Sequence, residues 1–117
     1  MNYSIIDTQI EIIKIYEKFR KNYLDYAKKI KEFAKEIYKD NFLFLAVFGS
    51  TVKGNYKPWS DIDIAIVLKN YIDEFERIKI LKRIRKEFGD INPFEVHFFT
   101  EEDWKKKEKL IDKYIIV

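Results

Sequence analysis

Cysteine is absent from this sequence of 117 residues, and glycine and proline are scarce, with three and two residues respectively. The lack of cysteine excludes a disulfide framework and any metal site built from thiolates. The longest apolar run, Phe42 to Phe48, is far shorter than the roughly 20 residues that a membrane-spanning helix needs. The N-terminus has no basic segment followed by an apolar stretch, so we expect no signal peptide. These absences predict a cytoplasmic protein that does not bind membranes.

Apolar residues make up 47% of the sequence, which is enough for one packed core but not for two. We therefore expect a single domain over residues 1–117, with a helical segment over 1–40 and a core over 41–117. The net charge is +3. This charge is too small to predict a nucleic-acid partner, although it would not repel an anionic substrate.

The N-terminal third has the pattern of a long amphipathic helix. Apolar residues recur at steps of three and four over residues 6–37. One unbroken helix of this length would reach about 45 Å, more than the width of a small domain. We expect it to bend near Lys21 and Asn22 or to project its first half. Residues 26–37 are expected to pack on the core, and residues 6–19 to meet a second chain.

Alternating and continuous apolar runs predict four strands downstream. "NFLFLAVF" reads as a buried strand, "DIDIAIVLK" as a second, "FEVHFFT" as a third and "YIIV" as a short last one. "TEEDWKKKEKLI" predicts a helix capped by its threonine. "EFERIKILKRIRKEF" predicts a helix whose apolar stripe consists of Phe75, Ile78, Leu81, Ile84 and Phe88. The order predicts a mixed α/β (α+β) fold with helices mainly on one face of a small mixed sheet.

Two short motifs flank the loop between the first two strands. Asp61 and Asp63 share one face of the second strand, because successive side chains alternate. Adjacent carboxylates repel each other unless a cation joins them, and Mg²⁺ prefers such oxygen pairs beside phosphates. Gly49 and Ser50 end the first strand, where free backbone N–H groups could hold a phosphate. Each motif also fits an ordinary turn, with two exposed acids in one case and a serine cap in the other.

The third strand adds Glu95 and, on the same face, His97. A carboxylate on a core-facing position would be costly. If this strand lies beside the second, three carboxylates gather near the Gly-Ser turn, an arrangement that suits two-metal nucleotidyl transfer. Alternatively Glu95 faces solvent, and His97 either bonds an acid or lines the edge of the site.

The segment "GSTVKGNYKPWSDIDI" resembles, without gaps, the signature of the minimal nucleotidyltransferases of the polymerase-beta superfamily. That signature is Gly-Ser, ten residues, then Asp-x-Asp, and "FEVHFFTEEDW" looks like the third acidic strand of the same family. The resemblance covers the chain from about Asn41 onward, plus the helix just before it. It implies a polymerase-beta-like fold with its catalytic core over 41–117.

Roles follow from the resemblance position by position. It implies that Gly49 and Ser50 contact the terminal phosphates of the nucleotide. Asp61 and Asp63 would bind Mg²⁺, and Glu95 would supply the third carboxylate, which assists a metal and draws the proton from the acceptor hydroxyl. All three acids are thus the expected catalytic and metal-binding residues.

Lys53 stands where the family often has a basic residue, so it is an expected nucleotide contact, though a solvated lysine fits equally. Four other positions depart from the family pattern. Glu95 replaces the more usual aspartate, and Tyr56 is bulky where a small residue is common. Thr51 and Val52 replace an Arg-Ala pair, which removes one phosphate contact.

The resemblance implies Mg²⁺-dependent transfer of a nucleoside monophosphate, AMP from ATP, to an acceptor hydroxyl. The shortness of the chain is similar to family members that act as antitoxins of a separate helical HEPN protein, which would carry that hydroxyl. A homo-oligomer also fits. One alternative is a nucleotide-binding or partner-masking module without turnover. Another, which we disfavour, is nucleic-acid binding through the basic helix "RIKILKRIRK".

Overall fold

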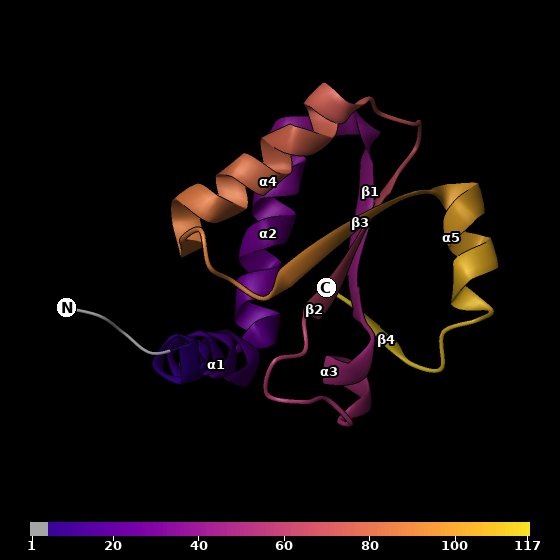
Figure 1. Ribbon diagram of the computed structural model, residues 1–117. Helices are drawn as coiled ribbons and strands as arrows, with labels where there is room; N and C mark the ends of the chain where they lie inside the picture. The colour runs from indigo at the N-terminus through magenta and orange to yellow at the C-terminus, as the bar shows by residue number, and fades with distance from the viewer. Residues whose placement is uncertain (1–4) are drawn as a thin grey trace.

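The computed structural model describes residues 5–117 as a four-stranded sheet with helices on both faces (Figure 1). The elements are α1 (Ile5–Lys21), α2 (Tyr23–Tyr38), a short 3-10 helix (Lys39–Asn41), β1 (Phe42–Phe48), α3 (Ser50–Lys53), β2 (Ile62–Leu68), α4 (Glu74–Phe88), β3 (Phe94–Thr100), α5 (Glu101–Glu108) and β4 (Tyr114–Ile116). The strand order is β3-β2-β1-β4, with β2 and β3 parallel and the other pairs antiparallel. The predicted mixed sheet is confirmed.

Alternation along β2 divides the interior into two layers. Ile62, Ile64 and Ile66 are fully buried against α2 and α4, which lie together on one face of the sheet (Figure 1). Ala65 and Val67 point to the opposite face, where α5 contributes a second, smaller cluster around its tryptophan. The helices therefore lie mainly on one face, as predicted, and the face of α5 is the more open one.

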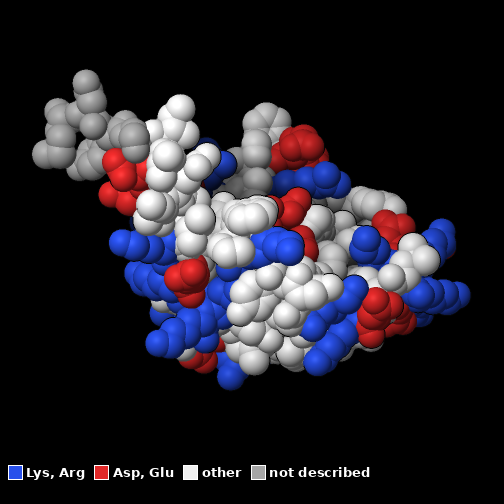
Figure 2. Space-filling view, turned by 60° about the horizontal axis from the view of Figure 1, so that its bottom comes forward, with Lys and Arg blue, Asp and Glu red and all other residues white. Residues whose placement is uncertain are grey.

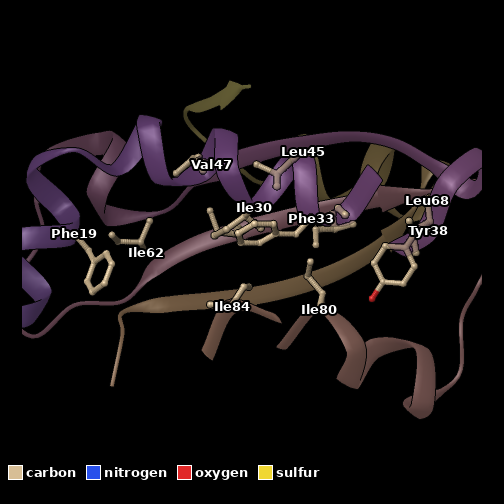
Figure 3. Packing of buried hydrophobic residues seen from close by; sticks show 14 of the residues in the cluster. Phe19, Ile30, Phe33, Tyr38, Leu45, Val47, Ile62, Leu68, Ile80 and Ile84 are labelled. Atoms are coloured by element: carbon tan, nitrogen blue, oxygen red, sulfur yellow. The ribbon is translucent and has the colours of Figure 1, made fainter. Parts of the chain in front are cut away.

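The N-terminal helical segment bends at Asn22, which separates α1 from α2 and lacks helical backbone angles, with φ −124° and ψ 38°. The bend was one of the two predicted outcomes. It allows Phe19 of α1 to enter the main core, where its ring lies beside Ile62 (Figure 3). Phe19 is 4% exposed. The expectation that residues 6–19 meet a second chain is therefore wrong for Phe19, although Ile6 and Ile10 are exposed.

Helix α4 has the predicted bounds. Its fully or nearly buried residues are Ile80 and Ile84, whereas Phe75 and Ile78 are exposed. The last three members of the predicted stripe pack on the core, but the first two do not, because steps of three drift around a helix of 3.6 residues per turn and carry them away from the buried face. Asp73 caps the first turn of α4 by accepting a hydrogen bond from the backbone N–H of Glu76.

Charges are interspersed over the face seen in Figure 2 and do not gather into one basic patch. On the basic helix α4, Arg83 is held by Glu36 at 2.9 Å and by Glu87 at 3.2 Å. Among residues 5–117 no helix is both long and apolar enough to cross a membrane.

Candidate active site

The predicted site residues converge where β1 ends and where β2 and β3 begin, on the face of the sheet that carries α5. Because β2 and β3 are parallel, their first residues lie side by side, and Asp63 is the register partner of Glu95. On the other side of β2, Asp63 is the partner of Phe48, the last residue of β1. The conditional prediction that the third strand lies beside the second is therefore correct.

Asp63, Glu95 and His97 form a compact polar cluster. One ligand atom from each lies within 4.8 Å of the others. His97 Nε2 is 3.1 Å from Oδ1 of Asp63 and 3.9 Å from Oε1 of Glu95. The Asp63 and Glu95 side chains are 24% and 52% exposed, so both carboxylates can meet a ligand from solvent. Of the two predicted positions for His97, the structure shows the one that bonds an acid.

The pKa values of Glu95 and His97 are both shifted by their surroundings in the cluster. Burial, followed by the charges of Asp63 and Asp61, raises the pKa of Glu95, and the proximity of His97 opposes this. The hydrogen bond to Asp63 raises the pKa of His97 above its usual range, and burial opposes it. A cation placed among the carboxylates would relieve this repulsion.

Gly49 closes the cluster from the side of β1. Its φ of +83° lies in the region that side chains disfavour, and a Cβ added to it would be 2.1 Å from Oδ2 of Asp63. The turn therefore needs glycine for two reasons, its backbone conformation and its contact with the carboxylate. Gly49 is the N-cap position of α3, and Ser50 is the first residue of that helix.

The remaining predicted site residues lie farther from the cluster centre. Asp61 is exposed just before β2, and its charge reaches Glu95, but it is not one of the residues within 4.8 Å. Lys53 lies at the end of α3 and forms an ion pair with Asp112 at 3.0 Å. The structure thus brings together Gly49, Asp63 and Glu95 most closely.

Sequence reasoning missed several neighbours of the site. Lys107 of α5 lies 5.9 Å from the ring centre of Phe48 and lowers the pKa of His97 through its charge. Tyr16 of α1 lies within electrostatic reach of Asp61; burial first, and then that charge, raises the pKa of its phenol. Arg20 of the same helix is buried against the loop that precedes Asp61. Only the spacing of Tyr16 and Arg20, one helical turn apart, could have hinted at a shared face.

The donor set fits the metal that the resemblance implies. Asp63 and Glu95 offer carboxylate oxygens, the ligands that Mg²⁺ and other hard divalent cations take in proteins. Burial is the main cause of the raised pKa of Glu95, and the nearby charges of Asp63 and Asp61 add to it, so a bound cation would favour the ionised carboxylate. The residues present are therefore suited to a divalent cation.

Comparison with known proteins agrees with this arrangement. The nucleotidyltransferase domain family matches residues 27–117. A crystal structure classed as a nucleotidyltransferase shares 35% sequence identity, with a TM-score of 0.59, over 79% of this chain and 97% of its own. Among curated proteins none matches.

Two other solved structures are less similar to this chain in sequence and in fold. Spectinomycin adenyltransferase from Enterococcus faecialis, solved with ATP and spectinomycin, shares the fold at 16% identity and a TM-score of 0.53, over 76% of this chain and 46% of its own. A toxin–antitoxin structure, MntA–HpeT, reaches 17% identity and a TM-score of 0.47, over 65% of this chain and 57% of its own, and so supports no argument. The family match and the 35% identical structure suffice: the chain belongs to the nucleotidyltransferase domain family.

Proposed function

We propose that this nucleotidyltransferase moves AMP from ATP, with Mg²⁺, to a hydroxyl group on a partner protein. The observation that carries the proposal is the alignment of Asp63 with Glu95 on adjacent parallel strands, with Gly49 directly against Asp63. Two carboxylates, one partly and one half exposed, thus lie beside a turn whose backbone can approach a phosphate closely. Family membership supports nucleotide transfer as the reaction class.

The chain's own residues would divide the work as follows. Asp63 and Glu95, with Asp61 at the rim, would hold Mg²⁺, which supplies positive charge to the triphosphate when bound. The turn at Gly49 and Ser50 would hold the terminal phosphates through backbone N–H groups. Lys53 stays a predicted phosphate contact. To bind phosphate it would have to leave its ion pair with Asp112.

Glu95 is the proposed general base. The acceptor oxygen attacks the α-phosphorus and gives up its proton to Glu95, and the bond to the β-phosphate oxygen breaks to release pyrophosphate. A carboxylate whose pKa is raised by burial and by neighbouring acids holds a proton better than an ordinary glutamate. The partial exposure of Glu95 leaves room for the incoming hydroxyl.

A protein acceptor follows from the resemblance to minimal nucleotidyltransferases that act as antitoxins of HEPN proteins. Exposed apolar side chains on α1, Ile5, Ile6 and Ile10, offer a contact surface outside the sheet for such a partner or for a second copy. We propose the HEPN-type partner as the source of the hydroxyl.

The test is transfer measured by intact-mass spectrometry. The chain is incubated with labelled ATP and Mg²⁺, alone and with the product of a neighbouring HEPN-like gene. We expect a mass gain of one or more AMP units on the partner, lost in Asp63→Asn and kept in the matched control Asp90→Asn, an exposed aspartate that is not part of the carboxylate cluster. Transfer that continues at the wild-type rate in Asp63→Asn would overturn the proposed site.

The second candidate function is a nucleotide-binding or partner-masking module. The exposure of Glu95 favours it: the proposed base is 52% exposed and a methylene longer than the aspartate usual in the family, whereas the metal-binding Asp63 is only 24% exposed. Mg²⁺-dependent ATP binding by calorimetry, with no mass gain on any protein, would support this function in place of transfer.

A further inference from the structure

We infer that Arg20, which lies upstream of the matched nucleotidyltransferase domain, is a positioning residue that fixes the loop between Gly49 and Asp63 in its nucleotide-binding shape. The family match begins at residue 27, so α1 is outside the part of the chain that the family shares. This inference rests on the proposed function in one respect, namely that the loop binds the nucleotide.

The contacts of Arg20 reach both ends of that loop. Its Nε donates to Oγ1 of Thr51 at 3.5 Å, next to the Gly49–Ser50 turn. Its Nη1 and Nη2 donate to the backbone carbonyl oxygens of Pro58, at 3.4 Å, and of Ser60. One guanidinium group therefore joins the residue after the Gly-Ser motif to the residue before Asp61.

Arg20 is 6% exposed, which is unusual for an arginine that forms no ion pair with a carboxylate of residues 5–117. The ring of Tyr56, whose centre lies 4.6 Å from Cζ, covers the guanidinium plane. Cation–π contact and three polar acceptors compensate for removing the charge from water. A planar fork with several donors is required here, and lysine cannot reproduce it.

Two of these contacts are positions where the chain departs from the motif it resembles. Thr51 and Tyr56, expected to weaken the site, are instead the groups on which Arg20 packs. Trp59, between the two carbonyl groups that Arg20 bonds, lines a groove of about 430 Å³ with Gln9, Ile12 and Ile13 of α1. Helix α1 thus bonds the loop through Arg20 and borders it again at Trp59.

The role differs from that of a core residue on the same helix. Phe19, the preceding residue, is equally buried but packs on Tyr26, Phe88 and Phe94, and among the described residues its apolar ring forms none of the polar contacts that Arg20 makes with the loop. Phe19→Leu is therefore a matched control: it loosens α1 against the core without removing a hydrogen bond or cation–π contact to the loop.

The experiment compares Arg20→Lys, Arg20→Gln, Tyr56→Leu and Phe19→Leu by two readings. The first is the dissociation constant for ATP with Mg²⁺ by calorimetry. The second is acrylamide quenching of tryptophan fluorescence without nucleotide. Trp104 is 3% exposed and Trp59, in the loop, is 64% exposed. Acrylamide therefore quenches mainly Trp59, and the degree of quenching measures how accessible the loop is.

We expect Arg20→Lys and Arg20→Gln to weaken ATP binding about tenfold, as the loss of hydrogen bonds to a charged donor does, and to increase quenching. Tyr56→Leu should change both readings in the same direction, but by less. Because it removes no buried charge, it tests the inference even if an Arg20 variant does not fold. Phe19→Leu should lower the melting temperature and leave both readings at wild-type values.

Wild-type readings in Arg20→Lys and Tyr56→Leu, or equal changes in Phe19→Leu, would overturn the inference. The outcome is separable from that of the proposed function. If the wild type binds ATP but transfers nothing, transfer fails while the two readings still decide the role of Arg20. If it does not bind ATP at all, quenching decides alone.

Discussion

Gly49 and Asp63 are in such close contact that a single methyl group between them would overlap the carboxylate. The position where a Cβ would stand on Gly49 is 2.1 Å from Oδ2 of Asp63. The turn that ends β1 and the acid at the start of β2 therefore form one rigid unit. The Gly-Ser and Asp-x-Asp motifs, ten residues apart in sequence, belong to a single packing arrangement.

We expect Gly49→Ala to reduce nucleotide transfer by about a hundredfold or more, because displacing a preorganised charged group by even an ångström has effects of that size. The matched control is Gly54→Ala. Gly54 also has a positive φ, +81°, but its ψ of 8° is left-handed helical whereas that of Gly49 is −161°, and no atom lies within 4 Å of its added Cβ. The measurement is the rate of AMP transfer, with unfolding followed by circular dichroism.

Gly54→Ala should be destabilised by about 1–2 kcal/mol from the left-handed backbone conformation alone. Gly49→Ala should be destabilised by more, because φ +83° with ψ −161° is a conformation that essentially only glycine adopts. Only Gly49→Ala should also lose activity. If Gly54→Ala lost as much activity, backbone strain would explain the result and the contact with Asp63 would not.

Glu95→Gln should lower kcat by about a hundredfold or more, the usual contribution of a general base. The fold should be unaffected, since the side chain is 52% exposed. Steady-state kinetics with Glu101→Gln, an exposed glutamate at the start of α5, provides the comparison. A rate close to that of the wild type in Glu95→Gln would remove this residue from the mechanism.

His97 is the only histidine in the sequence, so its ring protons give isolated NMR signals. Because Nε2 bonds Oδ1 of Asp63, we expect Mg²⁺ added at fixed pH to shift these signals as Asp63 changes partner. Asp63→Asn should abolish the shift, and Asp112→Asn should preserve it. Signals that do not respond to millimolar Mg²⁺ in the wild type would argue against metal binding at Asp63.

Tyr38 gives a pH-dependent stability that is unrelated to the active site. Burial, followed by the charge of Glu76, raises its pKa above the ordinary value of 10. Its hydroxyl donates to the backbone oxygen of Glu76 at 2.7 Å. Since the folded pKa exceeds the unfolded pKa, the stabilisation is complete below pH 10 and is lost as pH rises above it.

Tyr38→Phe should therefore lower the free energy of unfolding by about 1 kcal/mol at neutral pH. The difference from the wild type should shrink above pH 10, because only the wild type has a phenol at this position that ionises on unfolding. Urea unfolding at both pH values measures it. A difference independent of pH would mean that the phenol titrates alike in both states.

The regular elements were the most predictable part of the fold. The bounds of α4 and β3 agree with their sequence patterns because glycine, proline and a capping aspartate mark their ends. Phe75 was misplaced because a stripe built from steps of three drifts around a helix of 3.6 residues per turn, so its first members lie away from the face that Ile80 and Ile84 bury.

The site was predictable only in part. The motif spacing located Gly49 and Asp63, and alternation put Glu95 on a polar face. Their meeting depends on strand pairing, which no local pattern specifies. Arg20 could not be identified, because a charged residue in an amphipathic helix is normally solvated and its partners lie more than thirty positions away.

Strand β4 has a consequence beyond closing the sheet. Tyr114–Ile116 pairs with Ala46–Phe48 of β1, whose sequence "FLFLAVF" has no charged or proline residue. Such a strand left at a sheet edge is a template for aggregation, since its free N–H and C=O groups can recruit the same strand of another molecule. The three residues of β4 therefore cover the Ala46–Phe48 end of the longest apolar run in the sequence, so that this part of β1 cannot recruit a strand from another molecule.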